Sequence, residues 1–108
     1  MIPDIKIIKL EDIEDIINSI RKKLEKTVAE AYIIGSVAEG SAVYGESDLD
    51  LLIIPREKTE KLDWHSLLKD ELFQLLDRGL NLHILIADNE SYRRLIEIVR
   101  KSGIKVLG

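Results

Sequence analysis

The sequence predicts a single α+β domain, close to the α/β class, in which helices pack on a small mixed β-sheet. Segments with helical spacing of apolar residues alternate with short aliphatic runs that are bounded by Gly or Pro. The length of 108 residues suits one domain over residues 1–108. Because only 5% of the residues are aromatic, we expect a core made chiefly of Leu and Ile.

The first half of the chain is expected to form a helix followed by two strands. One apolar stripe with helical spacing predicts the helix, and it consists of Ile13, Ile16, Ile17, Ile20 and Leu24. Acidic residues in the first turn and lysines in the last turn match the helix dipole. We expect a strand over residues 30–34, ended by Gly35, and a buried strand over residues 49–54, ended by Pro55.

The second half is expected to alternate helix, strand, helix and a short edge strand. Asp63 is a good N-cap and Gly79 a good left-handed terminator for the first of these helices. Its predicted inner face consists of Trp64, Leu67, Leu68, Leu75 and Leu76. A third strand is expected over residues 80–86 and a last helix over 89–101, with Tyr92, Leu95, Ile96 and Val99 facing inward. Gly103 should end this helix, and residues 104–107 should form the edge strand.

Composition excludes several functional classes. The chain has no cysteine, which rules out disulfides, thiolate zinc sites and a cysteine nucleophile. The formal net charge of −4 argues against direct nucleic-acid binding. The longest aliphatic run, over residues 51–54, is too short to span a membrane, and charges interrupt the apolar N-terminus, which is therefore not a secretory signal. We expect a cytoplasmic protein.

The residues most suggestive of chemistry lie between residues 31 and 54. Gly35 and Ser36 follow a strand and begin a sharp turn, where backbone amides can bind an anion. Asp48 and Asp50 are one residue apart on the next strand, so both side chains leave the same face of the sheet. Either motif alone commonly marks only a helix start or a solvated strand end. Together they suit Mg²⁺ chelated by a nucleoside triphosphate.

At these residues the sequence resembles the minimal nucleotidyltransferase family, within the DNA polymerase β-like superfamily. The family pattern is Gly-Ser, a spacer of about ten residues, and Asp-x-Asp followed by an apolar strand. Here the pattern reads Gly35-Ser36, eleven residues, and Asp48-Leu49-Asp50-Leu51. The resemblance extends over nearly the whole chain, and it implies the nucleotidyltransferase fold.

The resemblance also implies a reaction and a set of roles. Asp48 and Asp50 would hold Mg²⁺, while Gly35, Ser36 and Ser47 would bind the nucleotide, most often ATP. A hydroxyl of a protein or small molecule would attack the α-phosphate in line, and pyrophosphate would leave. Small members commonly act with a helical HEPN-type protein as the antitoxin of a toxin–antitoxin pair. A chain this short would need such a partner, or a second copy of itself, to supply an acceptor surface.

Two departures from the family pattern bear on activity. The family usually supplies a third carboxylate from a later strand, and the position that we align with it is Asn81. Asparagine cannot accept a proton, although His83, expected on the same face, could act as a base. After Gly-Ser, where many relatives carry a cation, this chain has Val37, Ala38 and Glu39. The sequence does not place the remaining candidate cations, Arg56, Lys58, Arg93 and Arg94.

Three readings therefore remain open. The first is an active nucleotidyltransferase with reduced or altered catalysis. The second is a nucleotide-binding or partner-binding module with the same fold that transfers little, which the replacement of a carboxylate by Asn81 favours. The third is a structural subunit that uses neither metal nor nucleotide, and the combination of Gly35, Ser36, Asp48 and Asp50 argues against it. The other histidine, His65, has no partner at metal-ligand spacing and is expected at the surface.

Overall fold

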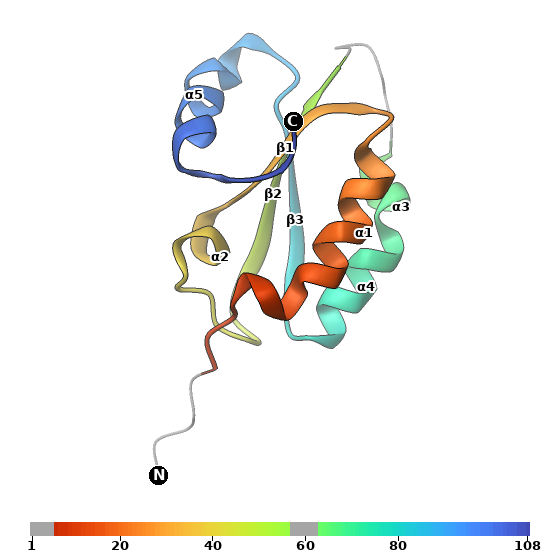
Figure 1. The fold of residues 1–108 in the computed structure, drawn as a ribbon, viewed down its shortest axis with the longest axis vertical. Coiled ribbons are helices and arrows are strands. Elements are labelled where there is room, and N and C mark those ends of the chain that lie inside the picture. The colour runs from red at the N-terminus through yellow and green to blue at the C-terminus, as the bar shows by residue number, and fades with distance from the viewer. Residues whose placement is uncertain (1–5, 57–62) are drawn as a thin grey trace.

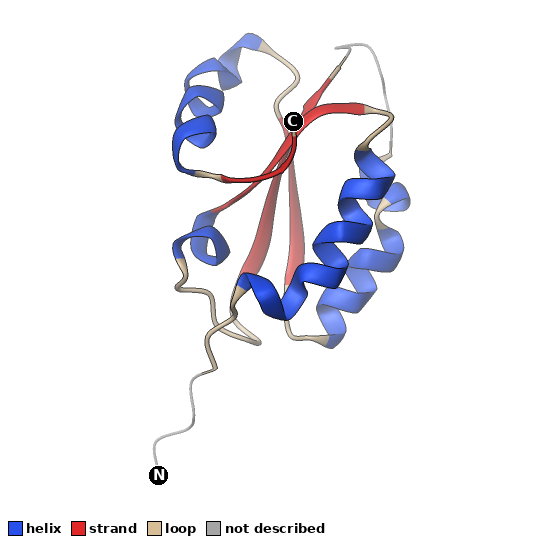
Figure 2. Ribbon diagram, viewed as in Figure 1, coloured by secondary structure: helices blue, strands red, loops and turns tan. Residues whose placement is uncertain are grey.

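The computed structural model describes residues 6–56 and 63–108 and confirms the predicted α+β class (Figures 1 and 2). In these residues, four strands form one mixed sheet in the order β3-β2-β1-β4. They are β1 (Val28–Ile34), β2 (Asp48–Pro55), β3 (Asn81–Ile86) and β4 (Ile104–Leu107). Strand β1 pairs antiparallel with β2 and with β4, whereas β2 and β3 are parallel.

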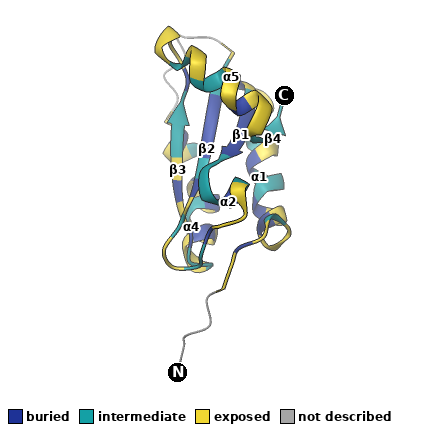
Figure 3. Ribbon diagram, turned by 90° about the vertical axis from the view of Figure 1, so that its left-hand side faces the viewer, coloured by how far each residue is buried: buried dark blue, intermediate teal, exposed yellow. Residues whose placement is uncertain are grey.

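Helices cover both faces of this sheet. They are α1 (Glu14–Leu24), α2 (Gly35–Glu39), α3 (Trp64–Leu67), α4 (Lys69–Asp77) and α5 (Arg93–Ser102), with short 3₁₀ turns η1 (Leu10–Ile13) and η2 (Glu90–Tyr92). Helices α1, α3 and α4 lie on one face, and α2 and α5 lie on the other (Figures 1 and 3). Among the described residues, no helix is long and apolar enough to cross a membrane.

The larger core lies between the sheet and helices α1 and α4. The predicted apolar stripe faces it, with Ile13 of η1 and Ile16, Ile20 and Leu24 of α1 almost fully buried. Alternate residues of β2 meet this stripe because successive strand side chains point to opposite faces. As predicted, this core is aliphatic, and Trp64 is its one buried aromatic side chain among the described residues.

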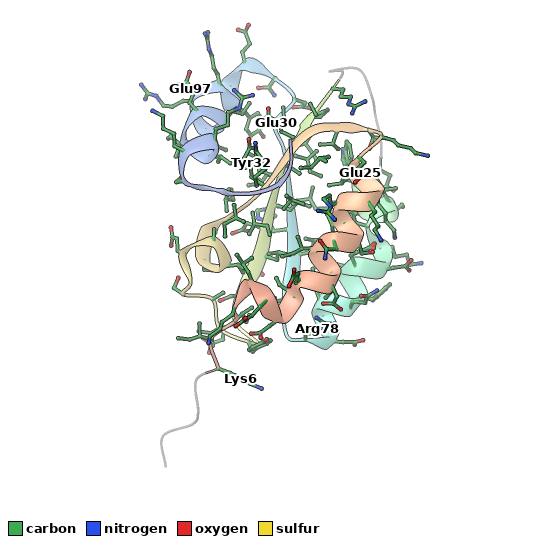
Figure 4. The ribbon with its side chains drawn as sticks, in the orientation of Figure 1. Lys6, Glu25, Glu30, Tyr32, Arg78 and Glu97 are labelled. Atoms are coloured by element: carbon green, nitrogen blue, oxygen red, sulfur yellow. The ribbon has the colours of Figure 1, made fainter. Side chains whose placement is uncertain are left out.

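A smaller core lies under α5, on the opposite face. Tyr32, Leu52, Ala87 and Val99 are its buried members. The Tyr32 hydroxyl donates a hydrogen bond to Glu30, whose carboxylate also pairs with Arg100 of α5 (Figure 4). The hydrogen bond from Arg100 lowers the pKa of Glu30, which keeps this carboxylate charged. The ion pair thus fastens α5 to β1 above the smaller core.

The region after Asp63 differs from the single helix that the sequence predicts. Asp63 caps it as expected, with Oδ1 accepting from the Ser66 amide at 3.2 Å, and Gly79 ends it with φ +79°. However, Leu68 leaves helical geometry (φ −101°, ψ 20°) and separates α3 from α4. Leu76, predicted to face inward, is 48% exposed. The buried stripe of α4 is centred one position earlier, at Leu75, which leaves Leu76 outside the buried face.

The other predicted elements are confirmed with small shifts in their bounds. Strand β1 begins two residues earlier than expected, at Val28, and β2 also includes Asp48 and Pro55. Gly103 ends α5, and residues 104–107 form the edge strand β4 beside β1.

One charged group is buried between α1 and α4. Glu71 is fully buried, although a helical glutamate is ordinarily solvated. Its Oε1 lies 2.6 Å from Nζ of Lys23, and its Oε2 accepts a 3.4 Å hydrogen bond from Ser19. The hydrogen bond to Glu71 raises the pKa of Lys23. This ion pair compensates the desolvated carboxylate and holds the two helices together.

Replacing Lys23 with Met should therefore destabilise the fold more than an ordinary surface change. The variant would leave the Glu71 carboxylate buried without its cation, at a cost of about 2–4 kcal/mol in the free energy of unfolding. Urea denaturation would measure this loss. Lys22→Met is the matched control, because Lys22 is exposed on the same helix. Equal stability of the two variants would contradict the role assigned to the ion pair.

Candidate functional site

The two aspartates open strand β2 and project from the sheet on the side that carries α2 and α5. Their intervening neighbour, Leu49, is fully buried on the opposite side, in the larger core. Asp48 is exposed, and the side chain of Asp50 is 25% exposed. Because α5 covers the smaller core farther along this face, the start of β2 is left open. The predicted placement of both carboxylates on one face is confirmed.

Strand β3 adds two polar side chains to this face. In the parallel register, Asp48 lies opposite Asn81 and Asp50 lies opposite His83. Nδ1 of His83 is 3.1 Å from Oδ1 of Asp50, within hydrogen-bond distance. Both Asn81 and His83 are exposed, while Leu82 between them is buried in the larger core. The structure thus places the four predicted residues as two neighbouring pairs on β2 and β3, and it shows a side-chain contact for the pair Asp50–His83.

The Gly35 turn meets the same aspartate from the other side. Ile34, the last residue of β1, pairs with Asp50 across the antiparallel register. The next residue, Gly35, has φ +73°, a left-handed conformation that side chains disfavour. A Cβ atom at Gly35 would collide with Oδ2 of Asp50 and would lie 3.3 Å from its Cγ. Glycine at this position therefore lets the Asp50 carboxylate lie directly against the turn.

Ser36 and Ser47 lie near this centre in different local structures. Ser36 is half-buried in the first turn of α2, and its carbonyl accepts a 2.9 Å hydrogen bond from the Ser41 amide. The Ser47 hydroxyl accepts a 2.8 Å hydrogen bond from the Val43 amide and so orders the loop before β2. The role that this contact supports for Ser47 is to hold the loop. A direct contact of Ser47 with nucleotide stays a prediction.

A cleft of about 250 Å³ opens beside Asp48 and Asn81. Its walls come from the loop before β2 and from the end of α4, including Gly45, Leu76 and Gly79. The Gly45 amide donates a 2.7 Å hydrogen bond to the Gly79 carbonyl, and a Cβ atom at Gly79 would lie 2.9 Å from the Gly45 nitrogen. The sequence analysis assigned Gly79 only to helix termination, and nothing in the spacing of the two glycines indicated this contact.

Most of the candidate cations lie away from the aspartates. Arg56 and Arg93 line a larger cleft of about 520 Å³ at the opposite end of β2, next to Arg100. Arg94 is exposed on α5, and Lys58 lies outside the described residues. The predicted exposure of His65 is confirmed. We place the candidate site at the start of β2 because Asp48 and Asp50 lie there; of these two, Asp48 lines the smaller cleft.

The donor set at the start of β2 and β3 suits a divalent cation that also binds phosphate oxygens. Carboxylate and amide oxygens are available from Asp48, Asp50 and Asn81, and Mg²⁺ in nucleotide sites typically takes only one or two protein carboxylates. Among residues 6–56 and 63–108, no group of three or more His, Cys, Asp or Glu residues is arranged to hold a metal ion. Asp48, Asp50 and His83 accordingly do not form such a group by themselves.

Comparison with known proteins agrees with this geometry. The family model of a nucleotidyltransferase domain matches residues 13–106, which include every element from α1 to α5 and all of β4 except its last residue. No curated protein matches the chain. The match covers well over half of the sequence and contains both the Gly35 turn and the two aspartates. The chain therefore belongs to the nucleotidyltransferase domain family.

Proposed function

We propose that this nucleotidyltransferase domain transfers AMP from ATP to a hydroxyl group of a protein, with the help of a divalent cation for which Mg²⁺ is the first candidate. The observation that carries the proposal is the convergence of three strand ends. Gly35 touches the Asp50 carboxylate, and β3 brings His83 within 3.1 Å of it. This arrangement supports the proposal, because backbone amides of the turn and the carboxylates beside it could bind a triphosphate and its cation together.

The residues around the turn are suited to bind the triphosphate. The first backbone amides of a helix have no partners within it, so the amides that begin α2 can donate to phosphate oxygens. Ser36, in the same turn, offers a hydroxyl donor. Asp48 and Asp50 would hold the cation, and Asn81 offers a neutral amide oxygen beside them. A bound cation would neutralise part of the negative charge on the phosphates.

In the proposed transfer, a hydroxyl oxygen of the acceptor forms a bond to the α-phosphorus of ATP. The bond from that phosphorus to the bridging oxygen of the β-phosphate breaks, pyrophosphate leaves with the electron pair, and the proton of the hydroxyl passes to solvent water. The chain contributes by positioning the reactants. The Gly35 turn would hold the β- and γ-phosphates. Asp50, which lies between Gly35 and His83, would hold the divalent cation. Precise placement of this kind provides much of the catalysis in phosphoryl transfer.

We further propose that the acceptor belongs to a helical partner protein of the HEPN type, as in a toxin–antitoxin pair. Exposed apolar side chains near the cleft support a protein acceptor. Leu76 is 48% exposed and lines the cleft, and Phe73, one helical turn earlier on α4, is 53% exposed. Apolar side chains at such spacing suit contact with another helix. A second copy of this chain is the competing source of that surface.

The second candidate function is nucleotide or partner binding with little transfer. The register of β2 and β3 favours it, because Asn81 lies directly opposite Asp48, where a carboxylate would face the cation. An amide in its place contributes no negative charge and cannot accept the proton of the acceptor. Transfer assays on the purified chain separate these two candidates.

The proposed transfer can be tested by incubating the chain with labelled ATP, a divalent cation and a co-expressed helical partner, and by measuring the label that becomes attached to protein. We expect label on protein from the wild-type chain and a loss of at least about 100-fold in rate for Asp50→Asn, because the variant removes a cation-binding charge. Asp88→Asn is the matched control, since Asp88 is exposed near the far end of β3. Saturable ATP binding without label would favour the binding module, and absence of both would reject nucleotide use.

Asn81→Asp should raise the rate of transfer by about 10-fold or more, since it supplies a carboxylate opposite Asp48. Single-turnover label transfer at saturating ATP measures this effect separately from nucleotide affinity. Asn18→Asp on α1 is the control for added charge, because α1 covers the opposite face of the sheet. A wild-type chain as fast as Asn81→Asp would show that the amide does not limit catalysis.

Gly35→Ala should abolish transfer by displacing the Asp50 carboxylate. Gly40→Ala provides a matched control, because Gly40 also has positive φ (+76°) but a Cβ atom there meets nothing within 4 Å. Both variants should lose about 1–2 kcal/mol of stability through backbone strain. Only Gly35→Ala should also lose ATP transfer, as measured with labelled nucleotide at a temperature where both variants are folded. Equal activity of the two variants would refute the role of the close approach.

A further inference from the structure

The Asp50–His83 pair has a geometry that a metal ion can occupy without rearrangement of the strands. Two donors about 2.1–2.2 Å from an ion and at right angles to each other are about 3.0–3.1 Å apart. Oδ1 of Asp50 and Nδ1 of His83 are 3.1 Å apart. Adjacent strands in parallel register fix this spacing, since Asp50 and His83 are direct partners in the pairing of β2 with β3.

The surroundings of the pair leave room for an ion and its remaining ligands. The side chain of His83 is 55% exposed and that of Asp50 is 25% exposed, so water and phosphate oxygens can reach both. The second oxygen of Asp50, Oδ2, lies against Gly35 and fills the space that a Cβ atom would take, so Oδ1 is the oxygen on the His83 side. Asp48 and Asn81 are the next pair in the same register. Because Asp48, Asp50 and His83 do not form a three-ligand group in the described part of the chain, the remaining ligands of the ion would be water and phosphate oxygens.

We propose that His83 is a metal ligand in this site, and that the site selects a first-row transition-metal ion, represented by Mn²⁺, over Mg²⁺. This inference rests on the proposed function, because the cation that it concerns is the one used with the nucleotide. The reason is the chemistry of the donors. Mg²⁺ strongly prefers oxygen, whereas imidazole nitrogen suits transition metals, and Mn²⁺ also binds carboxylate and phosphate oxygens.

Binding replaces the hydrogen shared by the pair with the ion. Nδ1 of His83 then donates its lone pair to the metal, and the ring carries its hydrogen on Nε2. Asp50 keeps its negative charge and binds through Oδ1. Ion selectivity in this site thus depends on His83, while charge neutralisation depends on Asp50.

The presence of two histidines in the chain gives a direct test on the full-length protein without nucleotide. Titration with Mn²⁺ should broaden the imidazole NMR signals of His83 at concentrations that leave those of His65 sharp. Loss of the electron paramagnetic resonance signal of free Mn²⁺, with and without competing Mg²⁺, gives the two affinities. We expect Mn²⁺ to bind about 10-fold or more tightly than Mg²⁺.

Variants separate the roles of the two residues. His83→Gln should weaken Mn²⁺ binding by about 10-fold or more and change Mg²⁺ binding by less than about 2-fold, so that selectivity disappears. Asp50→Asn should weaken binding of both ions. His65→Gln is the matched control and should change neither, because His65 is exposed on α3, on the other side of the sheet. Thermal denaturation establishes that each variant is folded.

Several results would overturn the inference: no effect of millimolar Mn²⁺ on His83, equal affinity for the two ions, or unchanged selectivity in His83→Gln. Its failure is distinguishable from failure of the proposed function. A chain that transfers AMP with Mg²⁺ but fails the Mn²⁺ test refutes only the metal selectivity. A chain that binds Mn²⁺ through His83 but attaches no label refutes the transfer reaction and retains the metal site.

Discussion

The close approach of Gly35 to Asp50 is the constraint on which the arrangement of the site depends. It arises where β1 ends, because Ile34 pairs with Asp50 and the chain then turns away from the sheet. Any side chain at residue 35 would meet both a disfavoured backbone conformation and the carboxylate. The antiparallel pairing of β1 with β2 therefore does more than form the sheet: it places the Gly35 turn beside the carboxylate of Asp50.

The two faces of the sheet have different tasks, and the alternation of side chains along β2 connects them. Leu49, Leu51 and Ile53 anchor the strand in the larger core. Between them, Asp50 projects onto the opposite face, where α5 does not cover it. Burial of these three apolar side chains thus fixes the face from which the aspartates project. A shift of one residue in the strand pairing would turn the apolar side chains to the opposite face and the aspartates into the core. The Glu71–Lys23 pair supports this indirectly by holding α1 and α4 against the larger core.

Much of this arrangement is predictable from the sequence because it depends on periodicity. The alternation in residues 80–86 correctly placed Asn81 and His83 on one face, and the helical stripe of α1 was correct. The pairing of His83 with Asp50 also needs strand order and register, which arise from contacts between distant segments. The break at Leu68 has no Gly or Pro to mark it. Burial of Glu71 was missed because glutamate is usually solvated, although its spacing of four residues from both Leu67 and Leu75 was a usable signal.

The replacement of a carboxylate by Asn81 and the presence of His83 are best understood together. Without a third aspartate, the centre has two negative charges from Asp48 and Asp50 and two neutral donors opposite them. In the proposed complex these two charges would balance one divalent cation, and the turn and that cation would together bind the negatively charged triphosphate. A nitrogen donor strengthens the binding of a transition-metal ion without adding charge. In the proposed metal site, coordination by His83 would strengthen the binding of a transition-metal ion and so compensate in part for the negative charge that is missing at Asn81.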